Sequence, residues 1–260
     1  MDSSGNVFYT DLKQVWKIAA NNSKSVVVPN VHTHELYVDP QDNLYGEHLW
    51  YEGDATKKWG HRVWRLAPGG TLTDVIPPSV GFREDGGDFT FVRDAKGNSY
   101  WADFAHPTVI HRKSQDGAAE DFCKGCTFAH VGWMTATRDG VVYFTDGGDV
   151  RRIGPDGAVS TVARNLAERR IASSDAENWH EVMGLTTDGG GNLYVAVYGA
   201  RSVKKVAADG TVTVAARTFW PWAPTGVLVA PNGELWILES SIIGGTRVRR
   251  IAKDGKAHTY

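Results

Sequence analysis

The chain has 260 residues, of which 42% are hydrophobic and 22% charged, which is enough to bury a sizeable core. The formal net charge of −2, without a basic stretch, argues against nucleic acid as a partner. Because no run of about 18 apolar residues occurs, we expect no membrane partner. No linker rich in Pro, Gly or Ser divides the sequence, so we expect a single domain over residues 1–260.

The N-terminal residues resemble the middle of a repeat. Met1 is followed directly by Asp2-Ser3-Ser4-Gly5, and no signal-peptide pattern is present. The loss of a leader and of an initial strand would explain such a start. In that case we expect a periplasmic or extracellular location, and otherwise a cytoplasmic one.

One pattern recurs six times along the chain: a turn, usually with Gly, followed by an aromatic-rich strand. The copies span residues 5–11, 42–48, 97–103, 140–146, 191–197 and 233–239. Each is followed by another strand, usually cationic, and by a short outer strand, with Asp-Gly turns between them in several copies. Five copies are preceded by an apolar strand, over residues 36–39, 89–93, 134–137, 185–187 and 227–230. Four short antiparallel strands in about 40 to 55 residues are typical of a propeller blade.

These repeats predict an all-β fold, a six-bladed β-propeller of four-stranded antiparallel blades. The first blade is expected to lack its inner strand, because the chain begins at the turn and His258–Tyr260 ends an outer strand. A β-sandwich is the alternative, but six copies with the same order of turn and strands disfavour it. We expect a monomer, with a dimer through the incomplete first blade as the alternative.

The pattern Asp-x-x-Gly-Asn-(Leu/Val)-Tyr-x-x-Asp, followed by Val-x-(Arg/Lys)-(Ile/Val), resembles the NHL repeat and the gluconolactonase-like propellers. The resemblance covers nearly the whole chain. It implies the fold, but not one chemistry, because similar propellers include lactonases, paraoxonase-like hydrolases, the peptide-amidating lyase and non-catalytic binding proteins. The enzymes that this pattern resembles hold a metal at one face of the propeller. At that face the inner strand of each blade starts and the aromatic-rich second strand ends.

Histidines concentrate at these strand ends. The positions are His32, His34, His48, His106, His130 and His180. Because histidine is the commonest zinc ligand, we predict a divalent metal, zinc before calcium. The predicted ligands are His34, His130, His180 and His32. The predicted catalytic groups are Glu35, Glu181 and His48, with Glu47 as a further candidate for a ligand or a base. Structural histidines and loop-capping carboxylates are the alternative interpretation.

The ligand pattern departs from both enzyme types. Gluconolactonase-like enzymes resemble one another in oxygen ligands at inner-strand starts, which here carry His34, Phe89, Gly132, Met183 and Thr225. A calcium site is therefore not evident. The amidating lyase, with histidines around zinc and a nearby Met, is closer in ligand type only.

An apolar pocket for a small organic substrate is predicted from Trp133, Trp179, Met183 and Trp222. Cys123 and Cys126 could form a local disulfide or remain free thiols. The leading functional hypothesis is a metal-dependent hydrolase of a small lactone, ester or phosphotriester, with a metal-activated water. The alternatives are a metal-dependent lyase like the amidating lyase and a non-catalytic binding propeller.

Overall fold

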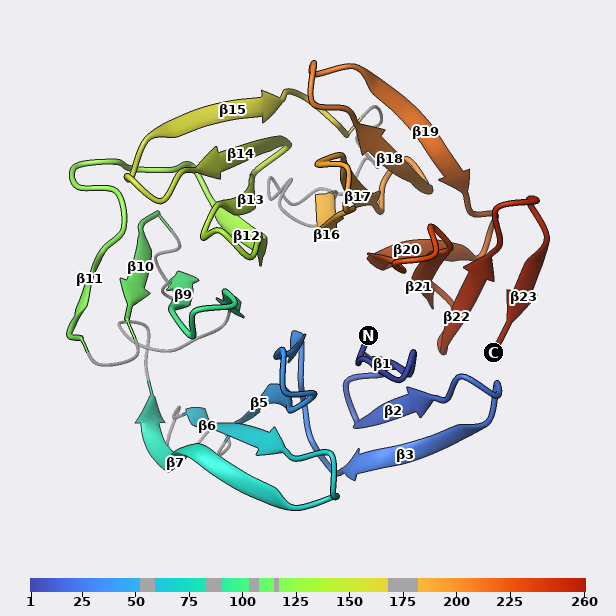
Figure 1. Ribbon diagram of the computed structural model, residues 1–260, viewed down its shortest axis with the longest axis horizontal. Coiled ribbons are helices and arrows are strands. Elements are labelled where there is room, and N and C mark those ends of the chain that lie inside the picture. The colour runs from blue at the N-terminus through green and yellow to red at the C-terminus, as the bar shows by residue number, and fades with distance from the viewer. Residues whose placement is uncertain (52–58, 83–89, 103–107, 115–116, 168–181) are drawn as a thin grey trace. The chain divides into compact units, whose positions relative to one another are not determined.

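The computed structural model describes residues 1–51, 59–82, 90–102, 108–114, 117–167 and 182–260. Every regular element in these ranges is a β-strand, and Figure 1 labels most of the strands in chain order. The described residues include no helix that is long and apolar enough to cross a membrane. The chain divides into two compact units, Met1–Asp121 and Phe122–Tyr260, and each carries three antiparallel sheets.

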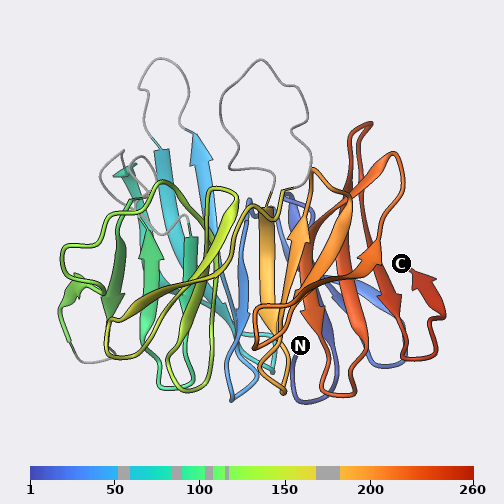
Figure 2. The same ribbon diagram turned by 90° about the horizontal axis from the view of Figure 1, so that it is seen from above.

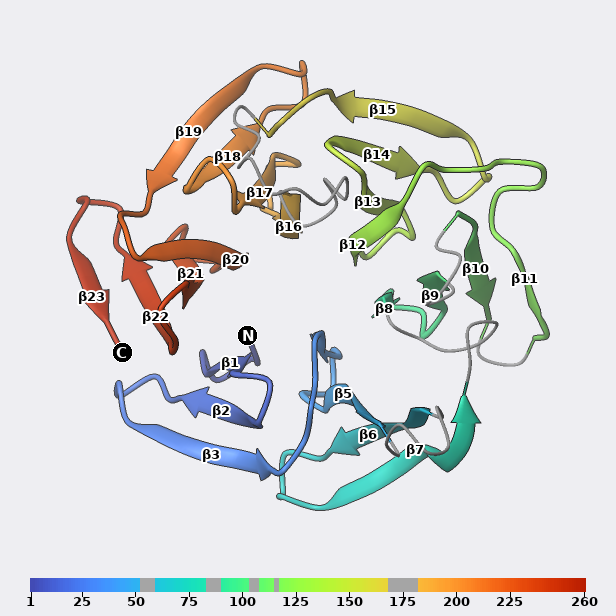
Figure 3. The ribbon, with the colours of Figure 1, turned by 180° about the vertical axis from the view of Figure 1, so that it is seen from behind.

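The first unit contains one three-stranded and two four-stranded sheets. Blade 1 has the order β1-β2-β3, blade 2 the order β4-β5-β6-β7, and blade 3 the order β8-β9-β10-β11; Figure 3 labels β8. The strands are β1 (Val7–Thr10), β2 (Gln14–Ile18), β3 (Lys24–Pro29), β4 (Leu36–Val38), β5 (Leu44–Tyr51), β6 (Trp59–Leu66), β7 (Leu72–Phe82), β8 (Thr90–Arg93), β9 (Ser99–Ala102), β10 (Ile110–Lys113) and β11 (Ala119–Asp121).

The second unit contains three four-stranded sheets, blades 4, 5 and 6, each of which follows the chain order from inner to outer strand. The strands are β12 (Val131–Ala136), β13 (Val142–Asp146), β14 (Asp149–Ile153), β15 (Val159–Ala163), β16 (Val182–Thr187), β17 (Leu193–Val197), β18 (Ser202–Val206), β19 (Val212–Arg217), β20 (Trp222–Val229), β21 (Leu235–Ser241), β22 (Thr246–Ile251) and β23 (Ala257–Thr259). Within a sheet the strands stand side by side (Figure 2).

These six sheets confirm the predicted fold class, a six-bladed β-propeller whose first blade lacks the inner strand. Three inner strands begin earlier than predicted: β12 at Val131, β16 at Val182 and β20 at Trp222. Each of them contains a β-bulge, which shifts the register and interrupts the apolar alternation on which the predicted boundaries rested. The single-domain expectation stays a prediction.

In four blades an aspartate fixes the turn before the aromatic-rich strand, namely Asp2, Asp39, Asp94 and Asp188. In blade 3, Asp94 Oδ1 accepts the backbone N–H groups of Lys96 and Asn98, and Oδ2 accepts the Asn98 amide and the Tyr100 hydroxyl. Such a carboxylate accepts hydrogen bonds from turn N–H groups that have no partner in the strand ladder. In blade 1, Asp2 holds Asn6 in the same way, at 2.8 and 2.6 Å, although no inner strand precedes it.

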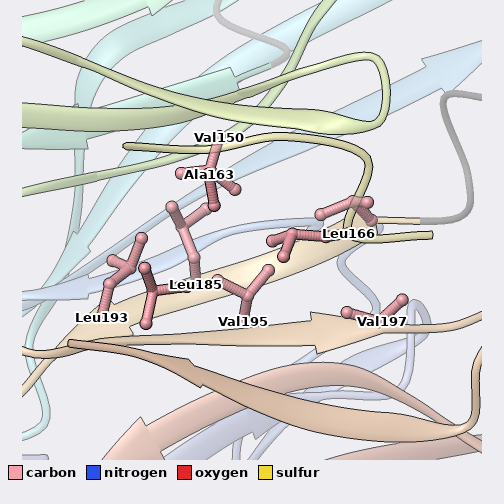
Figure 4. Close-up of a cluster of buried hydrophobic side chains, with 9 residues drawn as sticks. Val150, Ala163, Leu166, Leu185, Leu193, Val195 and Val197 are labelled. Carbon is pink, nitrogen blue, oxygen red and sulfur yellow. The ribbon is translucent and has the colours of Figure 1, made fainter. Parts of the chain in front are cut away.

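The packing between blades is apolar. In the second unit one buried cluster joins blades 4 and 5 and consists of aliphatic side chains (Figure 4). Its labelled members are Val150, Ala163, Leu166, Leu185, Leu193, Val195 and Val197. Alternate residues of β17 enter the cluster because successive strand side chains point to opposite faces.

Candidate functional site

The loop before β4 lies along the end of β5. β4 pairs only with Leu44–Gly46 of β5, so the next residues of β5 meet the loop through side chains. The backbone N–H of His32 donates to His48 Nδ1 over 2.8 Å, and the Thr33 hydroxyl donates to the Glu47 carbonyl oxygen. The rings of His32 and His34 meet edge to face, with centroids 4.7 Å apart. The structure therefore brings the predicted residues His32, His34 and His48 together.

Two of these histidines are held in opposite tautomers. His48 Nδ1 accepts a backbone N–H, so in the neutral ring the proton sits on Nε2. His32 Nδ1 lies 3.0 Å from the carbonyl oxygen of Leu12, which can only accept, so its proton sits on Nδ1 and Nε2 carries the lone pair. His32 therefore offers a base or a ligand, whereas His48 offers a hydrogen-bond donor.

His34 and Glu47 form the buried part of this cluster. His34 Nδ1 lies 3.7 Å from Glu47 Oε1, and the Glu47 side chain is only 3% exposed. Burial lowers the pKa of His34 to about 4. The pKa of His32 is lowered by burial and by the neighbouring His34. Both rings are consequently neutral near pH 7, the state in which imidazole accepts a proton or binds a metal.

An open pocket adjoins His48 on one face of blade 2. It has a volume of about 390 Å³ and is lined by His48, Trp50, Arg62 and Pro78. His48 and Trp50 are two residues apart in β5 and stack at 5.2 Å, and Arg62 lies opposite His48 in β6. Glu47 points to the other face, because neighbouring strand residues alternate. His48 thus presents its ring to this open, solvent-facing space.

The structure describes only one of the two remaining predicted catalytic residues, Glu35 and Glu181. Glu35 is half-buried in the same loop. His180, Glu181 and Trp179 lie outside the described residues, so their roles stay predictions.

His130 and Trp133 belong to the second unit. The backbone N–H of His130 donates to Asp146 Oδ1 over 2.9 Å, at the start of β12. Asp146 is buried and is paired with Arg151, Nε to Oδ2, at 2.6 Å. Trp133 packs against the aliphatic cluster of blades 4 and 5, and Cys123 and Cys126 of the same unit are joined in a disulfide.

The remaining predicted pocket residues lie in blades 5 and 6. Met183 is half-buried in β16. Trp222 begins β20, and the guanidinium of Arg247 lies 4.2 Å from its ring centroid. The same Arg247 pairs with Glu239, which is fully buried and also pairs with Arg249.

The predicted metal centre is not assembled by the described part of the chain. No three His, Cys, Asp or Glu side chains within it are grouped so that they could hold a metal ion. In the first unit His32 keeps the lone pair of Nε2, but the predicted ligand His180 lies outside the described residues. Zinc therefore stays a prediction that depends on His180 and on His130.

Sequence reasoning overlooked two arrangements, one in each unit. The first is Arg62, whose position in the pocket follows from its pairing opposite His48. The second is the arginine pair around Glu239. Cationic residues recur in the strands that follow the aromatic-rich strands, but the sequence does not say which pocket or carboxylate each of them meets.

The sequence matches no family model and no curated protein. Solved structures do share its fold. A virginiamycin B lyase from Staphylococcus aureus is 13% identical, with a TM-score of 0.60, over 100% of this chain and 82% of that one. A gluconolactonase from Xanthomonas campestris is 14% identical, with a TM-score of 0.58, over 90% and 79% of the two chains. A calcium-binding regucalcin from Agrobacterium tumefaciens is 14% identical, with a TM-score of 0.59, over 92% and 79%. At these identities the likeness concerns architecture, so this chain has the six-bladed propeller fold of the gluconolactonase, regucalcin and virginiamycin B lyase structures.

Proposed function

We propose that this chain is an enzyme that hydrolyses a small lactone or ester at the histidine cluster of its first unit. The observation that carries the proposal is the pair of opposite tautomers. His32 presents the lone pair of Nε2 and His48 presents an Nε2–H, and a hydrogen bond links the two residues. Acyl transfer to water needs such a pair, a base for the nucleophile and a donor for the carbonyl oxygen.

The reaction follows from these two groups. The substrate occupies the pocket beside His48, whose Nε2–H donates to the carbonyl oxygen. His32 Nε2 takes a proton from water as the water oxygen attacks the carbonyl carbon. The carbonyl then reforms, the ring C–O bond breaks, and the leaving oxygen receives the proton from His32. The buried carboxylate of Glu47, next to His34, favours the transient positive charge on the imidazoles.

A divalent metal would polarise the carbonyl and acidify water if it were bound. The predicted ligands are His34, His130, His180 and His32, but the described residues group no three donors, so no step is assigned to the metal. Elemental analysis before and after chelation tests this prediction. The metal prediction would be supported by stoichiometric zinc in the unchanged chain and by the loss of both zinc and activity in His34→Ala. Full turnover by metal-free protein would remove the metal from the proposal.

Assays of the purified chain with γ- and δ-lactones, aryl esters and a phosphotriester test the activity. We expect His32→Ala and His48→Ala each to lower kcat by about 100-fold or more. The matched control is His258→Ala, a change at an exposed position of β23, and it should keep full activity. Unchanged turnover in His32→Ala would contradict the proposal. A folded chain that turns over none of these substrates would favour a non-catalytic binding propeller.

Lyase chemistry at the same cluster is the second candidate. It is supported by the virginiamycin B lyase structures, one of which is a catalytically inactive histidine-to-alanine variant with quinupristin. In that reaction His32 would take a proton from carbon while a C–O bond breaks. Because elimination adds no water, product formed in ¹⁸O-labelled water would carry no label, whereas hydrolysis would introduce one labelled oxygen.

A further inference from the structure

Blade 6 carries four protruding apolar side chains at one end. Phe219 and Trp220 lie in the connection from β19 to β20 and are 72% and 64% exposed, and Ile242 and Ile243 lie in the β21–β22 turn and are 55% and 72% exposed. The two segments touch, because the Ile242 N–H donates to the Pro221 carbonyl oxygen over 3.2 Å. Figure 2 shows both at the same end of the strands. We call these four side chains the apolar tip.

Arginines border the apolar tip. Arg217 precedes Phe219 by two residues, and Arg249 Nη2 donates to the Arg217 carbonyl oxygen over 2.7 Å. The Arg201 carbonyl oxygen accepts the N–H of Thr218 over 2.8 Å. Arg247 stacks on Trp222. We call Arg201, Arg217, Arg247 and Arg249 the arginine collar.

The collar carries excess positive charge. Segments 198–201, 217–222 and 240–249, which form the tip and the collar, contain no Asp or Glu. The carboxylate that meets the collar is Glu239, which is fully buried between Arg247 and Arg249. Four guanidinium charges against one carboxylate leave a surplus beside the exposed apolar side chains, although the whole chain has a net charge of −2.

We propose that the apolar tip and the arginine collar dock on the surface of an anionic lipid membrane. Protruding side chains cannot enclose a small ligand, which needs a concave site. Two aromatic rings and two isoleucines on two adjoining segments form a patch, whereas single exposed apolar residues are ordinary. Trp and Phe beside Arg match the interface, where apolar side chains enter the acyl boundary and cations meet anionic headgroups.

This proposal goes beyond the hydrolase activity and departs from the sequence-based expectation of no membrane partner. That expectation rested on the lack of a long apolar run, which concerns spanning segments. An interfacial contact needs only a few side chains at the ends of connections, and cations around them.

Vesicle flotation of the full chain tests the proposal, with phosphatidylcholine alone or mixed with phosphatidylserine. We expect binding to the anionic vesicles only, and weaker binding as salt rises. Trp220→Ser combined with Ile243→Ser should weaken binding by roughly tenfold or more. Arg217→Gln should weaken it by roughly fivefold. The matched control, Val212→Ser with Val214→Ser on β19, changes side chains that are 40% and 44% exposed and should bind as the unchanged chain does.

Three results would overturn the proposal: no binding to anionic vesicles at low salt, equal binding by the tip variant, or an equal loss in the β19 control. Thermal unfolding of each variant shows whether the variant is folded. We expect every variant to fold, because the substituted side chains are exposed. Esterase activity on a soluble substrate should remain in the tip variant, so a failure of membrane docking is distinguishable from a failure of the proposed activity.

Discussion

At the scale of single residues, Glu239 is the most constrained charge that the structure describes. It is fully buried, and its two carboxylate oxygens lie 2.6 and 2.8 Å from Arg247 Nε and Arg249 Nε. Glu239→Gln would leave two guanidinium groups without their counter-charge. We expect the free energy of unfolding to fall by about 3 kcal/mol, as for other broken buried pairs, measured by urea denaturation.

The matched control for this change is Glu120→Gln. Glu120 also pairs with an arginine, Arg112, at 2.6 Å, but its side chain is 48% exposed. Solvent screens such a pair, so the loss should be less than about 1 kcal/mol. Equal losses in the two variants would show that the burial of Glu239 does not determine its contribution.

His34 makes stability depend on pH. Its pKa is about 4 in the folded chain, against 6.5 for the ordinary imidazole of an unfolded chain. As pH falls from 6.5 towards 4, the unfolded chain binds a proton that the folded chain does not. The free energy of unfolding therefore decreases over this range, by about 3 kcal/mol from His34. In His34→Asn this component should be missing when denaturation is followed against pH, and an unchanged pH dependence would refute the assignment.

The sequence predicted that several histidines meet, but not what each one does. His32 and His34 were both predicted as ligands, and their rings do touch. The tautomer of His32 depends on the carbonyl oxygen of Leu12, and that of His48 depends on the backbone N–H of His32, groups that lie in other strands or loops. Spacing along one segment cannot show such partners, because they are set by tertiary packing.

At the scale of elements, Gly184 sets how closely two inner strands approach. A Cβ at this position of β16 would lie 2.9 Å from the Thr225 carbonyl oxygen and 3.0 Å from Gly226 Cα. Both are backbone atoms of β20, which cannot rotate away. We expect Gly184→Ala to separate the strands and to lower the free energy of unfolding by about 2 kcal/mol.

Gly189→Ala is the control for this prediction. Gly189 lies in the turn after the same strand, and a Cβ there would meet nothing within 4 Å. Thermal unfolding should be nearly unchanged, within about 0.5 kcal/mol. A destabilisation as large as that of Gly184→Ala would mean that the loss comes from backbone freedom and not from the contact with β20.

Strand identities were more predictable than strand ends. The Asp-x-x-Gly-Asn turns and the apolar alternation are local, so they place every blade in the correct order. The bulges of β12, β16 and β20 depend on pairing with the next strand. A bulge adds one residue to one strand and so interrupts its apolar alternation. A strand predicted from this alternation alone therefore starts after the bulge and misses the residues before it.

At the scale of the whole molecule, the repeats predicted six sheets, and the first is the exception. Blade 1 keeps the turn of Asp2 and Asn6, but β1 pairs only with β2. In the other blades the corresponding strand, such as β13, pairs on both sides. A strand at a sheet edge leaves about half of its backbone groups without a ladder partner.

This difference predicts uneven hydrogen exchange within one fold. Amides of Val7–Thr10 should exchange roughly fivefold faster than those of Val142–Asp146, because a lost ladder bond lowers the local opening free energy by about 1 kcal/mol. Mass spectrometry of the two peptides measures both rates in one sample. Since β1 is nearly as buried as β13, with Tyr9 only 5% exposed, burial alone would give equal rates, and equal rates would refute the edge assignment. Protection of β1 that rises with protein concentration would instead support the dimer through blade 1, because a second copy would then supply the strand that pairs with this edge.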